Sequence, residues 1–71
     1  MTLSERAVGR LFGRAAEYKI PAYALAQEAN ISRVTLSNWR TSSSVPSLEN
    51  YLVVSEALDR MIERKVGANV G

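Results

Sequence analysis

The segment from Arg33 to Asn38 carries side chains that can recognise the exposed edges of nucleic acid bases. Arg33 has the guanidinium fork that pairs with guanine, and Asn38 can pair with adenine through two hydrogen bonds. Ser37 can donate or accept a hydrogen bond, and the methyl groups of Val34 fit the methyl group of thymine. To act together, these four side chains must share one exposed face.

A helix over residues 33–41 would give them such a face. At about 100° per residue, Thr35, Leu36 and Trp39 fall within one narrow arc, which predicts that they pack on the core. The four side chains above fall on the other side, together with Arg40. Between Glu28 and Glu49 the chain has no acidic residue. An ordinary solvated helix face has the same pattern, so this segment alone leaves both interpretations open.

The preceding residues predict a second short helix and a tight turn. Pro21 is favoured at the start of a helix, and Asn30 tolerates the left-handed backbone that ends one. Ser32 is a suitable N-cap for the following helix. A turn of about three residues between two short helices is typical of a helix-turn-helix, and Ala26 is small enough to lie where the two helices touch.

Two longer helices are predicted around this pair. The first begins after Thr2, which forms a capping-box pattern with Glu5, and it should stop before Pro21. Its predicted apolar face consists of Ser4, Val8, Leu11, Phe12, Ala15 and Tyr18. After a loop with Pro46, Ser47 is expected to cap a fourth helix that runs to about Lys65. Its predicted core stripe consists of Leu48, Tyr51, Leu52, Ser55, Leu58, Ile62 and Val66.

The far side of the fourth helix is also apolar, which predicts a second buried surface. We interpret this side as the interface of a homodimer, formed by Val53, Val54, Ala57 and Met61. Scattered exposed apolar residues are the alternative interpretation.

A basic stripe is predicted on the first helix, where Arg6, Arg10 and Arg14 recur every four residues. It faces away from the apolar side of that helix. Contact with a nucleic acid backbone and simple exposure to solvent are both open interpretations.

The stretch "YALAQEANISRVTLSNWRTSSSVPSLENYLVVSEAL" resembles the lambda-repressor-like (Cro/CI-type) helix-turn-helix domain in the order and spacing of its elements. The matching elements are "LA" at Leu25 and Ala26, "NIS" at 30–32, "TLSNW" at 35–39 and "PSLENYLVVSEAL" at 46–58. The resemblance implies an all-α, compact four- to five-helix bundle with the motif at residues 21–41, here with an extended C-terminal helix.

The resemblance also implies double-stranded DNA as the partner, bound by a homodimer with the third helix in the major groove. The residues implied to face base edges are Arg33, Val34, Ser37 and Asn38. The residues expected to lie near phosphates are Ser32, Arg40, Thr41, Ser42, Ser43 and Tyr23. The chain departs from the family at Ala22, where Gln is frequent, and at Arg40, where Glu is frequent.

Composition narrows the function further. The 71 residues, with a net charge of +2, predict one domain over residues 1–66 and a flexible tail over 67–71. With no Cys and no His, we expect no metal, no cofactor, no small-molecule ligand and no enzymatic activity. The absence of a long apolar run predicts no membrane association and a location in the bacterial cytoplasm or nucleoid. RNA is disfavoured because Tyr23 is the only candidate for an exposed stacking aromatic.

The sequence therefore predicts a DNA-binding transcriptional regulator, a repressor of phage or mobile-element type that recognises a palindromic operator. The alternative is a protein-interaction module, such as an antitoxin or adaptor, that has the same fold and little DNA binding.

Overall fold

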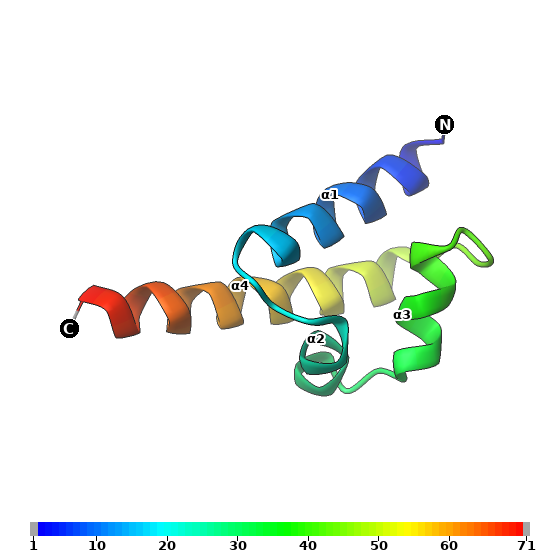
Figure 1. The fold of residues 1–71 in the computed structure, drawn as a ribbon. Helices are drawn as coiled ribbons and strands as arrows, with labels where there is room; N and C mark the ends of the chain where they lie inside the picture. The colour runs from blue at the N-terminus through cyan, green and yellow to red at the C-terminus, as the bar shows by residue number, and fades with distance from the viewer. Residues whose placement is uncertain (1, 71) are drawn as a thin grey trace.

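The computed structural model describes residues 2–70, with side chains described for residues 2–67. Within these residues the chain forms four helices and no strand: α1 (Leu3–Glu17), α2 (Ala22–Ala29), α3 (Arg33–Arg40) and α4 (Leu48–Val70). Figure 1 shows α4 running the length of the molecule, with α1 along one side of it and α2 and α3 along the other. The predicted all-α class is confirmed. No helix among the described residues is long and apolar enough to cross a bilayer.

The helix starts follow the capping signals in the sequence. The Thr2 hydroxyl accepts the backbone N–H of Glu5 at 3.2 Å, and the Glu5 carboxylate accepts the backbone N–H of Thr2 at 3.4 Å, which completes the capping box. Ser32 accepts the N–H of Val34 at 3.1 Å at the start of α3. Each bond satisfies a backbone donor that the first turn of a helix leaves unpaired.

Three helices end in the same way, each at a residue other than glycine in the left-handed conformation. These residues are Lys19, Asn30 and Ser42, with φ of 57°, 57° and 63°. At the end of α2, Ile31 N–H donates to the Ala26 carbonyl at 2.9 Å and Asn30 N–H donates to Gln27 at 3.2 Å. This pair of bonds is the Schellman motif, and equivalent bonds close α1 and α3.

The core lies where α1, α2 and α3 meet α4. Its largest fully buried side chains are Leu25, Leu36, Leu58 and Val54. Trp39 is also buried, as the sequence predicted, and it belongs to the same apolar cluster. α2 packs directly on α4, and α3 packs on α2 and α1, so the long helix positions the short helix pair through α2.

The predicted core stripe of α4 is wrong in part. Leu48, Leu52 and Val66 were expected in the core but are exposed, whereas Val54 and Ala57 are fully buried. The helix is rotated from the expected orientation, because the side that carries Ala57, Arg60 and Arg64 faces α2, where both arginines bond to Glu28. The helix also extends further than predicted, to Val70, and Gly71 lies outside the described residues.

Two glycines inside α1 lower its stability without a packing reason. Gly9 and Gly13 are exposed, and a Cβ added at either position would have no atom within 4 Å. We expect Gly9→Ala and Gly13→Ala each to raise the free energy of unfolding by about 0.5–1 kcal/mol, because Ala loses less backbone entropy in a helix. Thermal melts followed by circular dichroism would measure this, with the exposed Ala16→Gly as the opposite control. A lower melting temperature for either alanine variant would contradict the prediction.

Candidate nucleic-acid interface

Buried apolar side chains fix the orientation of α3. Leu36 is fully buried and Trp39 is 4% exposed, so the side of α3 that carries them faces the core. Thr35 lies beside them and is half-buried. The helix itself contains residues of modest helix propensity, so its stability depends on this packing and on the Ser32 cap.

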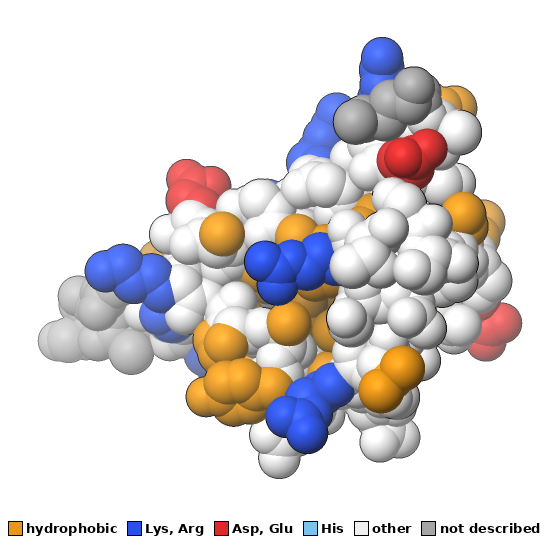
Figure 2. Space-filling model, turned by 45° about the vertical axis from the view of Figure 1, so that its right-hand side comes forward, with side chains coloured by type: hydrophobic (Ala, Val, Ile, Leu, Met, Phe, Trp, Pro, Cys, Tyr) orange, Lys and Arg blue, Asp and Glu red, His pale blue; other side chains and the backbone are white. Residues whose placement is uncertain are grey.

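The opposite side of α3 presents the predicted base-reading residues to solvent. Arg33 and Ser37 are exposed, Asn38 is half-buried, and Val34 is 68% exposed although it is apolar. The structure thus brings all four side chains to one side of one helix. Figure 2 shows apolar and basic side chains over the α2–α3 side of the molecule, with acidic side chains at the margins of the view.

The predicted phosphate-contacting residues surround this face at both ends of α3. Ser32 and Tyr23 are exposed near its N-terminal end, and Arg40 is exposed in its last turn. The remaining three, which follow α3, are also exposed: Thr41, Ser42 and Ser43. A groove of about 290 Å³ joins Tyr23 to Arg33 across the turn between α2 and α3.

The backbone after α3 has no free N–H groups to offer to a phosphate over residues 41–44. Thr41 donates to the Ser37 carbonyl at 3.0 Å, and Ser43 donates to the Asn38 carbonyl at 2.8 Å. Ser42 and Ser44 also donate to carbonyls of α3. The Thr41 hydroxyl lies 3.1 Å from the Ser37 carbonyl, to which it donates. The Ser43 hydroxyl lies 2.9 Å from Thr41 Oγ1 and donates to it, because the Thr41 hydrogen is used for the Ser37 carbonyl. Of the predicted residues in this loop, Ser42 is therefore the one whose hydroxyl group remains to donate to a phosphate.

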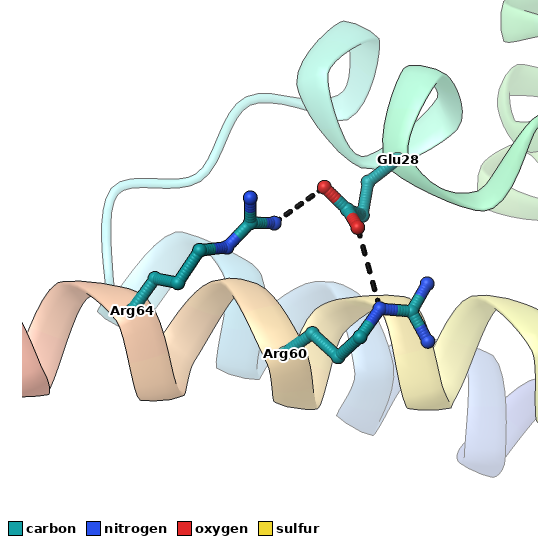
Figure 3. Close-up of polar contacts among 3 residues, drawn as sticks. All are labelled: Glu28, Arg60 and Arg64. Atoms are coloured by element: carbon teal, nitrogen blue, oxygen red, sulfur yellow. Dashed lines mark hydrogen bonds and ion pairs between the residues drawn. The ribbon is translucent and has the colours of Figure 1, made fainter.

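The charge of this surface is not neutralised within the protein. Among residues 2–67, no ion pair engages Arg33 or Arg40. The nearest acidic residue in sequence, Glu28 on α2, is held by α4 instead. It accepts a hydrogen bond from Arg60 Nε at 3.3 Å and another from Arg64, as Figure 3 shows. Glu28 is thereby directed away from α3, and the same contacts tie α2 to α4.

Nothing in known proteins identifies this surface. No family model, no curated protein and no solved structure matches this chain.

Two of the four residues predicted to form a dimer interface cannot do so. Val54 and Ala57 have no exposed surface because they pack in the core of the single chain, so assigning them to an interface was wrong. Met61 is half-buried and packs against the same core. Only Val53, which is 39% exposed, lies on an open surface.

The basic stripe of α1 divides between two environments. Arg14 forms an ion pair with Asp59 of α4, with 2.9 Å between Arg14 Nη2 and Asp59 Oδ1. Arg6 and Arg10 are exposed. The long-range pairs of Arg14, Arg60 and Arg64 were not foreseen, because no spacing rule connects residues on different helices.

Among the described residues, no group of three or more acidic side chains is placed to hold a metal ion.

The contacts of Glu28 predict a pH-dependent contribution to stability. The hydrogen bond from Arg64 is the main cause that lowers the pKa of Glu28 below its ordinary 4.5; partial burial opposes it, and Arg60 lowers the pKa further. The stabilisation is therefore complete above the ordinary pKa and disappears as the pH falls through the lower folded-state value. We expect Glu28→Gln to lower the urea midpoint at about pH 7 and to have much less effect at about pH 2. An equal effect at both pH values would contradict this origin.

Proposed function

We propose that this chain is a sequence-specific DNA-binding regulator, with α2 and α3 acting as a helix-turn-helix of the Cro/CI type. The observation that carries the proposal is the two-sided character of α3. Leu36 and Trp39 anchor one side in the core, and the other side presents Arg33, Val34 and Ser37 to solvent. A rigidly held helix with an exposed set of donors, acceptors and methyl groups is what direct readout of a major groove requires.

The dimensions of the helix fit this role. An α-helix with its side chains is about 10–12 Å across, close to the roughly 12 Å width of the major groove of B-DNA. In that groove the Arg33 fork would face guanine O6 and N7, and the Val34 methyl groups would meet a thymine methyl group. Asn38 lies one turn further along and would reach a more distant base pair.

Affinity and specificity would come from different parts of the surface. Arg40, Tyr23 and the hydroxyl groups near both ends of α3 would contact the phosphates, and these contacts carry no sequence information. The N-terminal end of α3, capped by Ser32, adds the positive end of a helix dipole. A homodimer would present two such helices to the two halves of a palindromic operator. Repression in a phage or mobile element is the regulatory role we propose.

Selection of bound duplexes from a random pool tests the proposal directly. We expect a palindromic consensus whose half-sites contain the G·C and A·T pairs that Arg33, Val34 and Asn38 can distinguish. Absence of any salt-dependent binding to duplex DNA would overturn the proposal and would favour the alternative protein-interaction module. Binding to duplex DNA without a consensus sequence would support the phosphate contacts but would reject base recognition by α3.

Arg40→Ala separates phosphate recognition from base recognition. Arg40 is exposed in the last turn of α3, outside the group assigned to base edges. We expect the variant to bind all duplexes more weakly, with the slope of log K against log salt concentration reduced by about 0.9 for each phosphate that the variant no longer neutralises. Titrations over a range of salt concentrations with a selected and a random duplex would measure this. Weaker binding of the selected duplex alone would instead place Arg40 on a base.

A further inference from the structure

An apolar groove lies between the N-terminal halves of α1 and α4, away from the α2–α3 pair. It encloses about 300 Å³ and is lined by Leu3, Ser4, Ala7, Pro46, Leu48 and Tyr51. Leu3 is 84% exposed and Leu48 is 75% exposed, and the exposed Leu52 follows Leu48 by one turn. An exposed apolar groove of this kind is a surface on which another molecule can bury apolar side chains.

The relative register of the two helices can be read from their contacts. The Tyr51 hydroxyl lies 3.5 Å from the Ala7 carbonyl, to which it donates, and Arg14 pairs with Asp59 at 2.9 Å. The two contacts join residues 44 and 45 positions apart. The helices therefore run in the same direction, as Figure 1 also shows, and Arg10 of α1 lies near the level of Glu56 of α4.

Opposite charges line the two outer edges of this groove. At about 100° per residue, Arg10 lies about 20° and Arg6 about 60° from Leu3, along the solvent-facing edge of the groove on α1. Glu49 and Glu56 lie beside Leu52 on the side of α4 that faces away from α1. All four charged residues are exposed. We call the groove, Leu52 and these two edges the α1–α4 patch.

We propose that the α1–α4 patch binds a second copy of the same chain. A two-fold axis parallel to the helices places the groove of one copy against the groove of the other. The same axis places the basic edge of each copy over the acidic edge of its partner, so that Arg10 faces Glu56 of the second copy. An axis across the helices would place the basic edge of one copy against the basic edge of the other. The patch is therefore complementary to itself in only one of these two arrangements.

This interface leaves the proposed reading surface free. It uses no residue of α2 or α3. It also replaces the dimer interface that the sequence predicted on α4, which is ruled out because Val54 and Ala57 are buried. A standard interface covers about 800 Å² per partner, which is near one sixth of the 5010 Å² surface of this chain. The patch covers only two to three turns of two helices. We therefore expect a dissociation constant on the order of micromolar, typical of small interfaces.

Sedimentation equilibrium of the full chain without DNA tests the proposal independently of the proposed function. We expect a monomer–dimer equilibrium, which Leu48→Glu should weaken at least about tenfold by burying a charge against the partner's groove. Val66→Glu is the matched control, because Val66 is an exposed apolar residue of α4 outside the patch. Circular dichroism melts should show both variants folded, since neither side chain belongs to the core.

A charge exchange tests the arrangement itself. We expect Arg10→Glu and Glu56→Arg each to weaken the dimer, and the double variant to restore it. Three results would overturn the proposal: a monomer at about millimolar concentration, Leu48→Glu associating as the unmodified chain does, or a double variant as weak as the single ones. An unmodified chain that binds duplex DNA but stays monomeric would reject the patch alone. An unmodified chain that dimerises through the patch but binds no duplex DNA would reject the DNA-binding function alone.

Discussion

Replacing Trp39 with alanine is expected to remove about half of the free energy of unfolding of this domain. Trp39 is 4% exposed and packs in the core together with Leu36 and α1. Truncation of a buried Trp to Ala costs about 3–5 kcal/mol, because apolar burial decreases and a cavity remains. A domain of this size has a free energy of unfolding of only about 4–10 kcal/mol. Urea unfolding followed by circular dichroism should show a strongly lowered midpoint, since α3 would be without its largest anchor.

The control for this prediction lies on the same helix. Val34 is 68% exposed, so Val34→Ala should change the free energy of unfolding by no more than about 0.5 kcal/mol. The pair therefore compares the anchored and the exposed sides of α3 directly. A decrease of less than about 1 kcal/mol for Trp39→Ala would mean that the core does not hold α3 in the way described.

The second large effect is expected on DNA affinity. Arg33→Ala and Asn38→Ala should each cost about 1–3 kcal/mol on the selected duplex, or about 5- to 150-fold in the dissociation constant. Each removes a side chain suited to two hydrogen bonds with one base. Titrations with the selected duplex and with duplexes changed at single base pairs should show relaxed preference at one position of each half-site.

A matched control removes a positive charge elsewhere. Lys65 is exposed on α4 and is not part of the proposed surface. Lys65→Ala should therefore leave the base preference unchanged and weaken binding only slightly. If Arg33→Ala or Asn38→Ala keeps both full affinity and full preference, the exposed side of α3 is not the reading surface. Because Asn38 is half-buried, a melt of Asn38→Ala must accompany its titration.

Local signals in the sequence predicted the helix starts and ends well. The Thr2–Glu5 box, the Ser32 cap and the left-handed Asn30 all depend on interactions within a few residues. Such interactions can be read from spacing alone, because both partners lie on the same turn. The face of α3 was also predictable, since its few large apolar residues lie on a single side.

The face of α4 could not be predicted in the same way. Apolar residues occur on nearly every side of this helix, so periodicity leaves several orientations open. Leu48 and Leu52 are larger than Ala57, yet Ala57 is the residue in the core. Close packing of α2 on α4 selects the small residue, and that requirement appears only when the two helices are placed together.

Ion pairs between helices were beyond prediction for a related reason. Glu28 and Arg60 are separated by 32 residues, and Arg14 and Asp59 by 45. A single sequence gives no signal for pairs at such distances. The missed pairs decide which cations stay unpaired, because Arg14, Arg60 and Arg64 are engaged and Arg33 and Arg40 are not among the pairs of residues 2–67.

Hydrogen bonds within six residues close the C-terminal ends of α1, α2 and α3. This local closure has a consequence for the rate of folding. Each of these helix ends can form on the timescale of a short loop, before any distant segment arrives. Because α2 and α3 have only eight residues each, these ends persist only once packing against the other helices stabilises them. The slower step is the closure of the chain that brings α1 beside α4, across the sequence separation of 44 between Ala7 and Tyr51. With mostly local contacts, the domain belongs among the proteins that fold in microseconds to milliseconds.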